Sequence, residues 1–388
     1  MAATVTIQGH ETKPSPELRV LGIWLDPKLS WNPQIKKAQH RANGNSKSIE
    51  KLTASTWGAT FEKARIMYKA IVKPAMLYGS QIWAATDKIP RRMEEPLNRA
   101  QALCLKKILG AYKSTPTRVV EMETGTAPVK HYLQGMRLQY AGKTSGYPAQ
   151  QVIKRATDKI KAQLQERRNR GQTDRPPQKA TDLEDFQTLT QLINREKKAR
   201  EEAGGGSRGK DKKRQSQAEE IAGHLWKKAW EKEPTRPGTP KALRRFGSHN
   251  YLLYKNLKRA EASLAIQIRS EHIGFRAYLF QRRVPGYESR TCSCGYLSQN
   301  PEHMLLRCPQ WSEGRGEWRA KARDRNYQAI ISNQDDLQRI TRWILRKGFI
   351  KQFSLVEETE RWVEAREKEA EEKKRRRGGR QGGHLQRH

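Results

Sequence analysis

Apolar residues recur at helical spacing over much of the first 140 residues of the chain. The segment 59–79, ATFEKARIMYKAIVKPAMLYG, has one apolar face, which consists of Phe61, Ala64, Tyr68, Ile71 and Val72. Apolar residues three and four positions apart lie on the same side of an α-helix, so this segment is predicted to be an amphipathic helix. Proline lacks a backbone N–H, and Pro74 is therefore expected to kink or end the helix, with Gly79 as its stop signal.

The segment before this helix has a different pattern. Residues 18–31, LRVLGIWLDPKLSW, begin with a short apolar run that is typical of a strand, and Asp26-Pro27 indicates a turn. From Pro33 to about Leu52 the spacing is helical and the polar positions are mostly basic. The chain is therefore predicted to enter its first helix from a strand and a turn.

A second amphipathic helix is predicted to follow, with Pro96 in its first turn and Gly110 at its end. Its apolar face consists of Leu97, Ala100, Cys104 and Ile108. Residues 115–140 contain two further helical patterns, TPTRVVEMETG and PVKHYLQGMRLQYA. We expect these helices to pack on one another as a small bundle.

The pattern changes between about residues 146 and 245, where stretches such as REKKAREEAGGGSRGKDKKRQSQ are charged and interrupted by glycine. This composition is typical of solvated helices and flexible linkers, and it predicts a long, charged, largely disordered linker. Apolar periodicity returns at 251–280, and helix-like segments follow at 316–332 and 335–347. The fold class is predicted to be mainly α.

Composition adds a constraint on the partner. Of the 388 residues, 35% are hydrophobic and 30% are charged, so several small packed units are expected in place of one continuous core. The formal net charge of +36 implies a polyanionic partner, with nucleic acid as the first candidate and an anionic membrane surface as the second. The sequence has no run of 18 apolar residues and no secretory signal at its N-terminus, so neither a membrane span nor secretion is predicted.

Three of the four cysteines lie with one histidine inside CSCGYLSQNPEHMLLRC, residues 292–308. The spacing is C-x-C-x8-H-x4-C, formed by Cys292, Cys294, His303 and Cys308. Three thiolates and one imidazole are a common ligand set for structural zinc, whereas buried thiols alone would not require a histidine at this interval. Four protein ligands fill the coordination shell, so the predicted Zn²⁺ is structural and not catalytic.

Basic residues occur in several runs that are candidates for phosphate contacts. The predicted nucleic-acid-binding residues are Lys36, Lys37, Arg91, Arg92, Lys106, Lys107, Arg244, Arg245, Arg290 and Arg307. Interleaved aromatic residues, Trp226, Trp230, Tyr251 and Tyr254, are candidates for stacking on bases. Single charge runs are usually solvated surfaces, but together these runs predict RNA or DNA as the partner, and the run at 373–377 suits nuclear import.

No catalytic residue is predicted. GGGSRGKD at 204–211 matches the glycine-rich phosphate loop, but no strand precedes it and Asp211 replaces the required hydroxyl, so it is interpreted as a linker. The pair Asp335-Asp336 is interpreted as the acidic first turn of a helix, in preference to a two-metal site. His131 and His272 lie on apolar stretches and are expected to be packed or hydrogen-bonded.

Two stretches resemble LINE-type (non-LTR) retrotransposon reverse transcriptases, especially fungal ones. LRVLGIWLDPKLSW and STWGATFEKARIMYKAIVKPAMLYGSQIW resemble the segment that follows the polymerase palm. The matching residues are Leu21, Gly22, Trp24, Leu25, Asp26, Leu29, Trp31, Arg65, Tyr68, Pro74, Tyr78, Gly79 and Trp83. IQIRSEHIGFRAYLFQRRV and CSCGYLSQNPEHMLLRCP are similar to the family's C-terminal end, where a cysteine–histidine knuckle implies zinc at the four ligands named above.

The departures from the family bear on activity. The catalytic palm and endonuclease of the family have no counterpart in this sequence, and the interval where many fungal members carry ribonuclease H has no Asp-Gly dipeptide. The resemblance therefore implies a truncated, C-terminal remnant without the polymerase carboxylates. The predicted domains are a thumb-like helical region at 1–145, the charged linker at 146–245, a helical segment with the CCHC zinc knuckle at 246–330, and a charged helical tail at 331–388. The resemblance accounts for the first and third of these, and composition for the linker and the tail.

The expected function is RNA or DNA binding in the nucleus by a retroelement protein that is not an enzyme on its own and does not bind membranes. One alternative is a non-catalytic subunit that assists RNA-directed DNA synthesis by a full-length element protein. The other is a protein-interaction module that uses charged helices at 185–230 and 355–377. Steep salt dependence of nucleic-acid binding would separate the first interpretation from the last.

Overall fold

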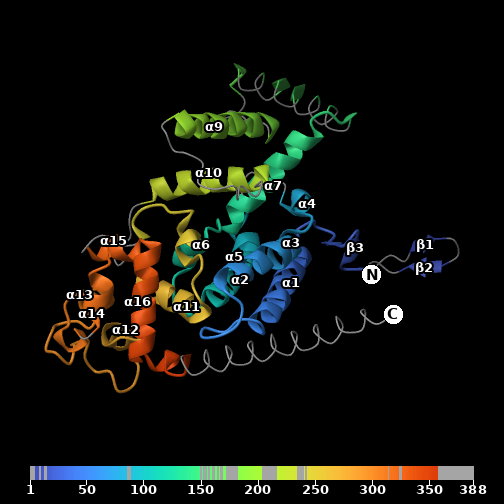
Figure 1. The fold of residues 1–388 in the computed structure, drawn as a ribbon. Coiled ribbons are helices and arrows are strands. Elements are labelled where there is room, and N and C mark those ends of the chain that lie inside the picture. Colours follow the sequence, from blue (N-terminus) through green and yellow to red (C-terminus); the bar gives the residue numbers. More distant parts are fainter. Residues whose placement is uncertain are drawn as a thin grey trace, which may run out of the picture. The chain divides into compact units, whose positions relative to one another are not determined.

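The chain is mainly helical, as predicted, in a computed structural model (Figure 1). It divides into two compact units, and each is described by itself. The first unit comprises Met1–Ser46, Lys69–Ala102 and Thr126–Thr235, and the second comprises Lys47–Tyr68, Leu103–Gly125 and Arg236–His388. The structure describes residues 5–7, 10–12, 15–84, 89–148, short groups between 151 and 171, 182–202, 216–233, 240, 243–312, 314–322 and 326–356.

The first unit contains two antiparallel hairpins and a set of helices. Its strands are β1 (Val5–Ile7), β2 (His10–Thr12), β3 (Leu18–Val20) and β4 (Ile23–Leu25). Its helices are α1 (Asn32–Glu50), α3 (Lys73–Leu77), α4 (Ser80–Trp83), α5 (Arg91–Leu109), α7 (Val129–Thr144), α9 (Asp182–Glu202) and α10 (Gln217–Lys232). The division between the units falls within α1 and α5.

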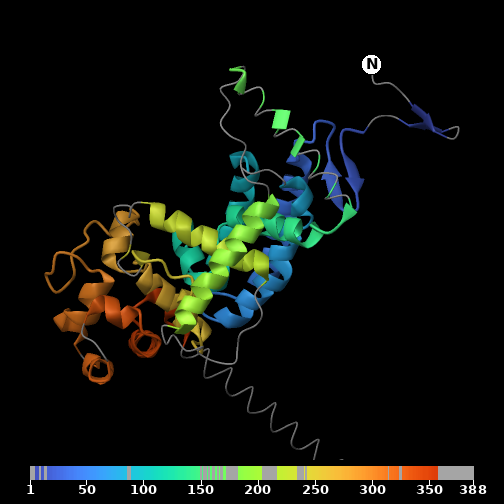
Figure 2. The ribbon, with the colours of Figure 1, turned by 90° about the horizontal axis from the view of Figure 1, so that it is seen from above.

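The second unit contains the remaining helices. They are α2 (Phe61–Met67), α6 (Thr117–Thr124), α11 (Arg259–Arg269), α12 (Arg276–Gln281), α13 (Pro301–Leu306), α14 (Arg315–Arg319), α15 (Tyr327–Ile331) and α16 (Gln334–Lys347). Short 3-10 turns lie at Asn250–Tyr254, Pro309–Trp311 and Lys351–Phe353. Figure 2 shows the helices of residues 301–347, coloured orange, grouped together.

The start of the chain follows the predicted order of strand, turn and helix. Strands β3 and β4 pair with Val20 opposite Ile23, and α1 follows. The Asp26 carboxylate accepts hydrogen bonds from the backbone N–H groups of Ser30 and Trp31, each at 3.0 Å. These bonds fix the turn immediately before α1 and explain why the Asp-Pro pair marks the helix boundary.

The amphipathic segment at 59–79 is helical but not continuous. The α-helical pattern of α2 ends at Met67, a π-helical segment covers Tyr68–Val72, and α3 carries Pro74 in its first turn. Phe61, Ala64, Tyr68 and Val72 are buried as predicted, but Ile71 is 49% exposed. A π-helical turn is wider than an α-helical turn, so Val72 and not Ile71 returns to the buried face.

Helix α5 corrects one boundary prediction. Its apolar face of Leu97, Ala100, Cys104 and Ile108 is buried as expected, but the helix begins at Arg91, so Pro96 lies inside it and not in its first turn. The Pro90 carbonyl accepts the N–H groups of Met93 and Glu94 at 2.9 and 3.1 Å. The additional first turn is therefore hydrogen-bonded before the proline interrupts the pattern.

The prediction of a largely disordered linker at 146–245 is wrong for two helices. Within the first unit, α9 and α10 pack on α7 and on each other (Figure 1). A Cβ atom at Gly135 would lie 2.3 Å from the Ala218 carbonyl oxygen, so glycine permits close contact between α7 and α10. The apolar stripe of α10, which includes Ile221 and Trp226, is buried although the surrounding sequence is highly charged. Residues 203–215 lie outside the described residues.

The second unit has a hydrophobic core built around α11 and α16. The core residues include Leu264, Ile268, Phe275, Tyr327, Ile330, Ile340, Trp343, Phe353 and Val356. Residues from both sides of position 330 therefore share one core. The predicted tail beyond residue 356 lies outside the described residues. In the part of the chain that is described, no helix combines the length and apolarity needed to cross a bilayer.

Candidate metal centre

A tight turn brings the first two cysteines close together. The N–H of Gly295 donates to the Cys292 carbonyl, and the N–H of Cys292 donates to the Tyr296 carbonyl, both at 2.9 Å. Gly295 has a φ of +88°, which is a conformation that favours glycine. This turn allows Cys292 and Cys294 to direct their thiols to one point.

Helix α13 positions the other two side chains. The Asn300 side chain accepts the N–H of His303 at 2.9 Å, and Pro301 occupies the first helical position. At the other end of α13, the His303 carbonyl accepts the N–H of Cys308 at 2.8 Å. This bond folds the chain back after the helix, so that Cys308 lies beside His303.

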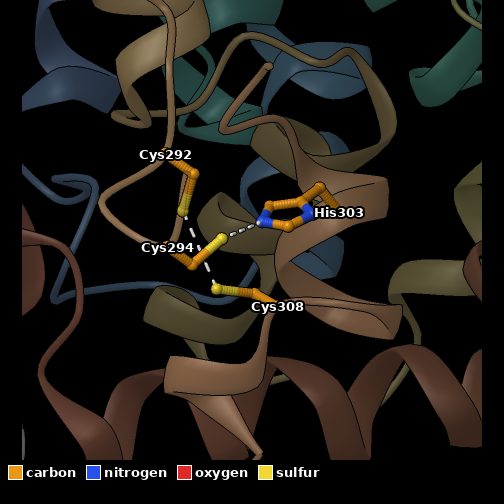
Figure 3. A group of neighbouring side chains, drawn as sticks. All are labelled: Cys292, Cys294, His303 and Cys308. Carbon is orange, nitrogen blue, oxygen red and sulfur yellow. Dashed lines mark hydrogen bonds between the residues drawn. The ribbon is translucent and has the colours of Figure 1, made fainter. Parts of the chain in front are cut away.

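The four side chains converge as the spacing predicted (Figure 3). The Sγ atoms of Cys292 and Cys308 are 3.7 Å apart, and Cys294 Sγ lies 3.3 Å from His303 Nε2. All four ligand atoms lie within 4.8 Å of one another. Two thiolates on a tetrahedral zinc ion, each about 2.3 Å from the metal, would be separated by about 3.8 Å. The donor atoms thus fit a four-coordinate metal ion.

Ionisation of the thiols is uneven without a metal. Burial raises the pKa of Cys292, but hydrogen bonds from Cys294 and Gln299 outweigh burial, and the pKa lies below its ordinary value. Burial and the neighbouring Cys292 thiol raise the pKa of Cys308 to about 11. Burial and the charges of two arginines lower the pKa of His303, so its imidazole is neutral at pH 7. A divalent ion would bind the deprotonated thiols and this neutral imidazole.

A buried arginine supports the site from behind. Arg315 is 7% exposed and donates hydrogen bonds from Nη2 to the carbonyls of Cys308 and, at 3.3 Å, Met304. A divalent ion with three thiolates and a neutral imidazole carries a net charge of −1. The cation at Arg315 therefore opposes the charge that the ligand set would carry when filled.

One aromatic side chain covers the site from the solvent side. The Tyr296 ring stacks on the His303 ring with 4.2 Å between centroids and 4° between planes. Tyr296 remains 42% exposed, so its outer surface is accessible. Neither Tyr296 nor Arg315 was identified by sequence reasoning, because a ligand motif gives no direct signal for the residues around it.

The predicted basic contacts are dispersed, and most of them are exposed. The exposed ones are Lys36, Lys37, Arg91, Arg92, Arg244, Arg245, Arg290 and Arg307. Lys107 differs because its ammonium is paired with the Glu50 carboxylate. Arg290 and Arg307 both flank the candidate metal centre, in the sequence and in the turn around it.

Two of the proposed base-stacking aromatics are inside the protein. Trp226 is buried in the first unit, and Tyr254 is buried in the second, where its hydroxyl donates to Glu123. The Arg65 guanidinium lies over the Tyr251 ring, with its carbon 3.9 Å from the ring centroid. Stacking on bases is therefore excluded for Trp226 and Tyr254, because both rings are buried. The prediction was wrong for these two residues because a helical pattern does not distinguish exposed aromatic residues from core ones.

The other interpretations of charged and histidine residues agree with the structure. Asn333 caps α16 by accepting the N–H of Asp336 at 3.1 Å, so the acidic pair begins a helix. Asp336 is buried and pairs with Arg339 at 2.8 Å. His131 is buried in α7, and His272 Nδ1 lies 3.3 Å from the Ser114 hydroxyl.

Comparison with known proteins finds a distant similarity to a retrotransposon protein. The chain is similar to a 115 kDa protein in the type-1 retrotransposable element R1DM of Drosophila melanogaster, with 19% identity over 349 residues. The similarity covers 87% of this chain and 28% of the relative, so the chain spans less than a third of that protein's length. No protein-family model and no solved structure matches. The similarity supports a retrotransposon-related protein.

Proposed function

We propose that this chain is a nucleic-acid-binding region of a LINE-type retroelement protein, of the fungal kind that its motifs resemble. In this proposal it binds RNA or DNA through lysine and arginine contacts to phosphates, acts in the nucleus and supplies no polymerase catalysis itself. The net charge of +36 and the relation to a retrotransposon protein support it.

The observation that carries the proposal is the closed ligand set of Cys292, Cys294, His303 and Cys308, with exposed arginines around it. Arg276 donates to the Thr291 carbonyl at 3.5 Å, and the Arg290 carbonyl accepts the N–H of Gln299 at 2.8 Å. A zinc ion would cross-link the turn at 292–296 to α13 and so hold this surface in one conformation.

On this surface, protein side chains and not the metal ion would contact the nucleic acid. Arg276 and Arg290 present exposed guanidinium groups to phosphate oxygens, as does Arg307, which also lies 3.5 Å from the Glu302 carboxylate. The exposed face of Tyr296 offers a stacking surface for one base. Phosphate contacts carry no sequence information, so the binding is expected to be largely independent of base sequence.

A salt series tests the proposal directly. Binding of the purified chain to labelled single-stranded RNA and duplex DNA is measured between 50 and 200 mM salt, with and without a zinc chelator. If about six to ten phosphates are contacted, affinity falls by roughly three to five decades over this range. Chelation is expected to weaken binding further, because the surface around the centre loses its fixed conformation. Weak binding that does not change with salt would contradict the proposal.

A further inference from the structure

Two cations from distant parts of the sequence converge on one loop of the second unit. Lys106, in the last turn of α5, donates from Nζ to the Lys113 carbonyl at 2.7 Å. Arg282, which directly follows α12, donates from Nη2 to the Ser114 carbonyl at 3.4 Å. The two acceptor carbonyls belong to consecutive residues, so both cations contact the same loop.

The aromatic groups under the loop fix this arrangement. The Arg282 guanidinium lies over the Tyr278 ring, 5.6 Å from its centroid, and Tyr278 stacks on Tyr112 at 5.6 Å and 17°. The Tyr278 hydroxyl is hydrogen-bonded to the Ser114 hydroxyl. Arg282 is therefore held against the aromatic residues under the loop, and Lys106 is held by the Lys113 carbonyl, which lowers the cost of ordering both side chains when a ligand binds.

The charge of this pair is unbalanced. Among the described residues, no carboxylate lies within ion-pair distance of Lys106 or Arg282, whereas the adjacent Lys107 is paired with Glu50. Burial lowers the pKa of Lys106, which shows that its ammonium is partly desolvated without a compensating anion. The pKa of His272 is lowered to about 4 by burial and then by Arg282 and Lys106, so both cations act on one ring.

We infer that Lys106 and Arg282 form a binding site for one phosphate group of a nucleic-acid strand, with the loop at 112–114 as its base. Lys106 has three N–H donors and uses one on Lys113, and Arg282 has five and uses one on Ser114, so each has donors left for phosphate oxygens. This inference rests on the proposed nucleic-acid binding and assigns one of its contacts.

In the described part of the chain, the structure distinguishes Lys106 from the neighbouring Lys107 by its lack of a carboxylate partner. In the sequence, Lys106 and Lys107 are equivalent candidates, but only Lys106 is without a carboxylate partner among the described residues. A purely structural Lys106, which stabilises the carboxyl end of α5 through the helix dipole, would affect stability and not phosphate binding. The two roles therefore predict different measurements.

The test uses the full chain with Lys106→Gln, Arg282→Gln and the double variant. The matched control is Arg283→Gln, which removes an exposed cation adjacent in sequence to Arg282. Binding to RNA and duplex DNA is measured against salt. Because the two cations share one phosphate, the double variant is expected to lower the salt slope by about 0.7 for a single strand or 0.9 for a duplex, not by twice that amount. Each single variant lowers it partly, and the Arg283→Gln control leaves it unchanged.

A phosphate competition identifies the source of the ligand. Inorganic phosphate replaces chloride at constant ionic strength in the binding assay. Competition in the natural chain that disappears in the double variant supports a site for any phosphate group. A lower slope in the double variant without such competition supports a site specific for the phosphodiester of a strand.

Two outcomes overturn the inference in distinguishable ways. If the natural chain binds nucleic acid with a steep salt slope and the double variant keeps that slope, only the site at Lys106 and Arg282 is wrong. If the natural chain shows no salt-dependent binding, the proposed function itself fails and the site with it. The unfolding midpoint of each variant is also measured, and a midpoint equal to that of the natural chain excludes loss of structure as the cause of a lower salt slope.

Discussion

Arg315 donates a hydrogen bond to the backbone carbonyl of Cys308, a candidate metal ligand, and is itself almost completely buried. A buried cation needs a compensating charge, and the filled ligand set would supply a net charge of −1. Arg315→Gln should therefore weaken metal binding by about 10- to 100-fold, in the range found for residues that support metal ligands. Arg315→Lys keeps the charge and should lose less. Chelator competition followed by Co²⁺ absorption measures both.

Arg319 provides the control for this experiment. It lies four residues further along the same short helix, is exposed, and donates to the Leu306 carbonyl at 3.4 Å. Arg319→Gln should leave metal affinity unchanged. Equal affinity losses for the Arg315 and Arg319 variants would indicate a general effect of positive charge and would contradict a specific role for Arg315.

Cys308→Ala should abolish stoichiometric zinc binding and loosen the segment from Tyr287 to Trp311. The reason is that binding of a structural metal and folding of its loop share one free energy. Metal content by elemental analysis and amide hydrogen exchange over this segment provide the measurement. Cys104→Ala is the matched control, because Cys104 is the fourth cysteine, is buried in α5 and does not belong to the cluster. An unchanged zinc content in Cys308→Ala would refute the ligand assignment.

Glu123→Gln should destabilise the second unit by about 3–5 kcal/mol, because it leaves a buried guanidinium without its counter-charge. Glu123 binds Arg269 through both carboxylate oxygens, at 2.7 and 2.8 Å, and both side chains are almost fully buried. Asn250 also donates to this carboxylate at 3.0 Å. Urea unfolding measures the loss.

The surface pair Glu166–Arg170 gives the comparison for that measurement. Its atoms are also 2.7 Å apart, but both side chains are 64% exposed. Glu166→Gln should change the free energy of unfolding by no more than about 1 kcal/mol, since solvent screens exposed pairs. A similar loss in both variants would mean that burial does not set the energy of the Glu123 pair.

The sequence predicted correctly those features that depend only on residues close to one another in the chain. The four metal ligands fall within 17 residues, so their spacing alone brings them together. The face of Leu97, Ala100 and Cys104 could be predicted for the same reason, because helical periodicity is a local property. Local pattern gave the wrong start for α5, since Pro90 supplies the first carbonyl acceptor for that helix.

Features that depend on distant residues could not be predicted. Glu123 and Arg269 are 146 positions apart, and no local pattern marks two charged residues as one buried pair. Helix α10 was assigned to a linker because its apolar stripe is diluted by lysines and glutamates on the other faces. Its burial depends on Gly135 of α7, which lets the two helices approach closely. Tertiary packing, and not the average composition of the segment, thus determines that α10 is a buried helix.

The stability of the first unit should fall as the pH is lowered from about 6.5 to about 4. Burial and the charge of Lys130 lower the pKa of His131 from 6.5 to about 4. Between these values the unfolded chain binds a proton at this histidine and the folded chain does not. Protons therefore favour unfolding, and the stabilisation is fully present only above pH 6.5, with a slope of at most about 1.4 kcal/mol per pH unit from one histidine.

Urea unfolding of the natural chain and of His131→Phe at several pH values between 7 and 4.5 isolates this contribution. Phenylalanine keeps an aromatic ring at the buried position and removes the titrating group, so the variant should show a smaller fall in stability over this range. The difference between the two curves belongs to His131, because the other ionisable groups are common to both proteins. Parallel curves would mean that His131 ionises at the same pH in the folded and unfolded chains, in conflict with its burial in α7.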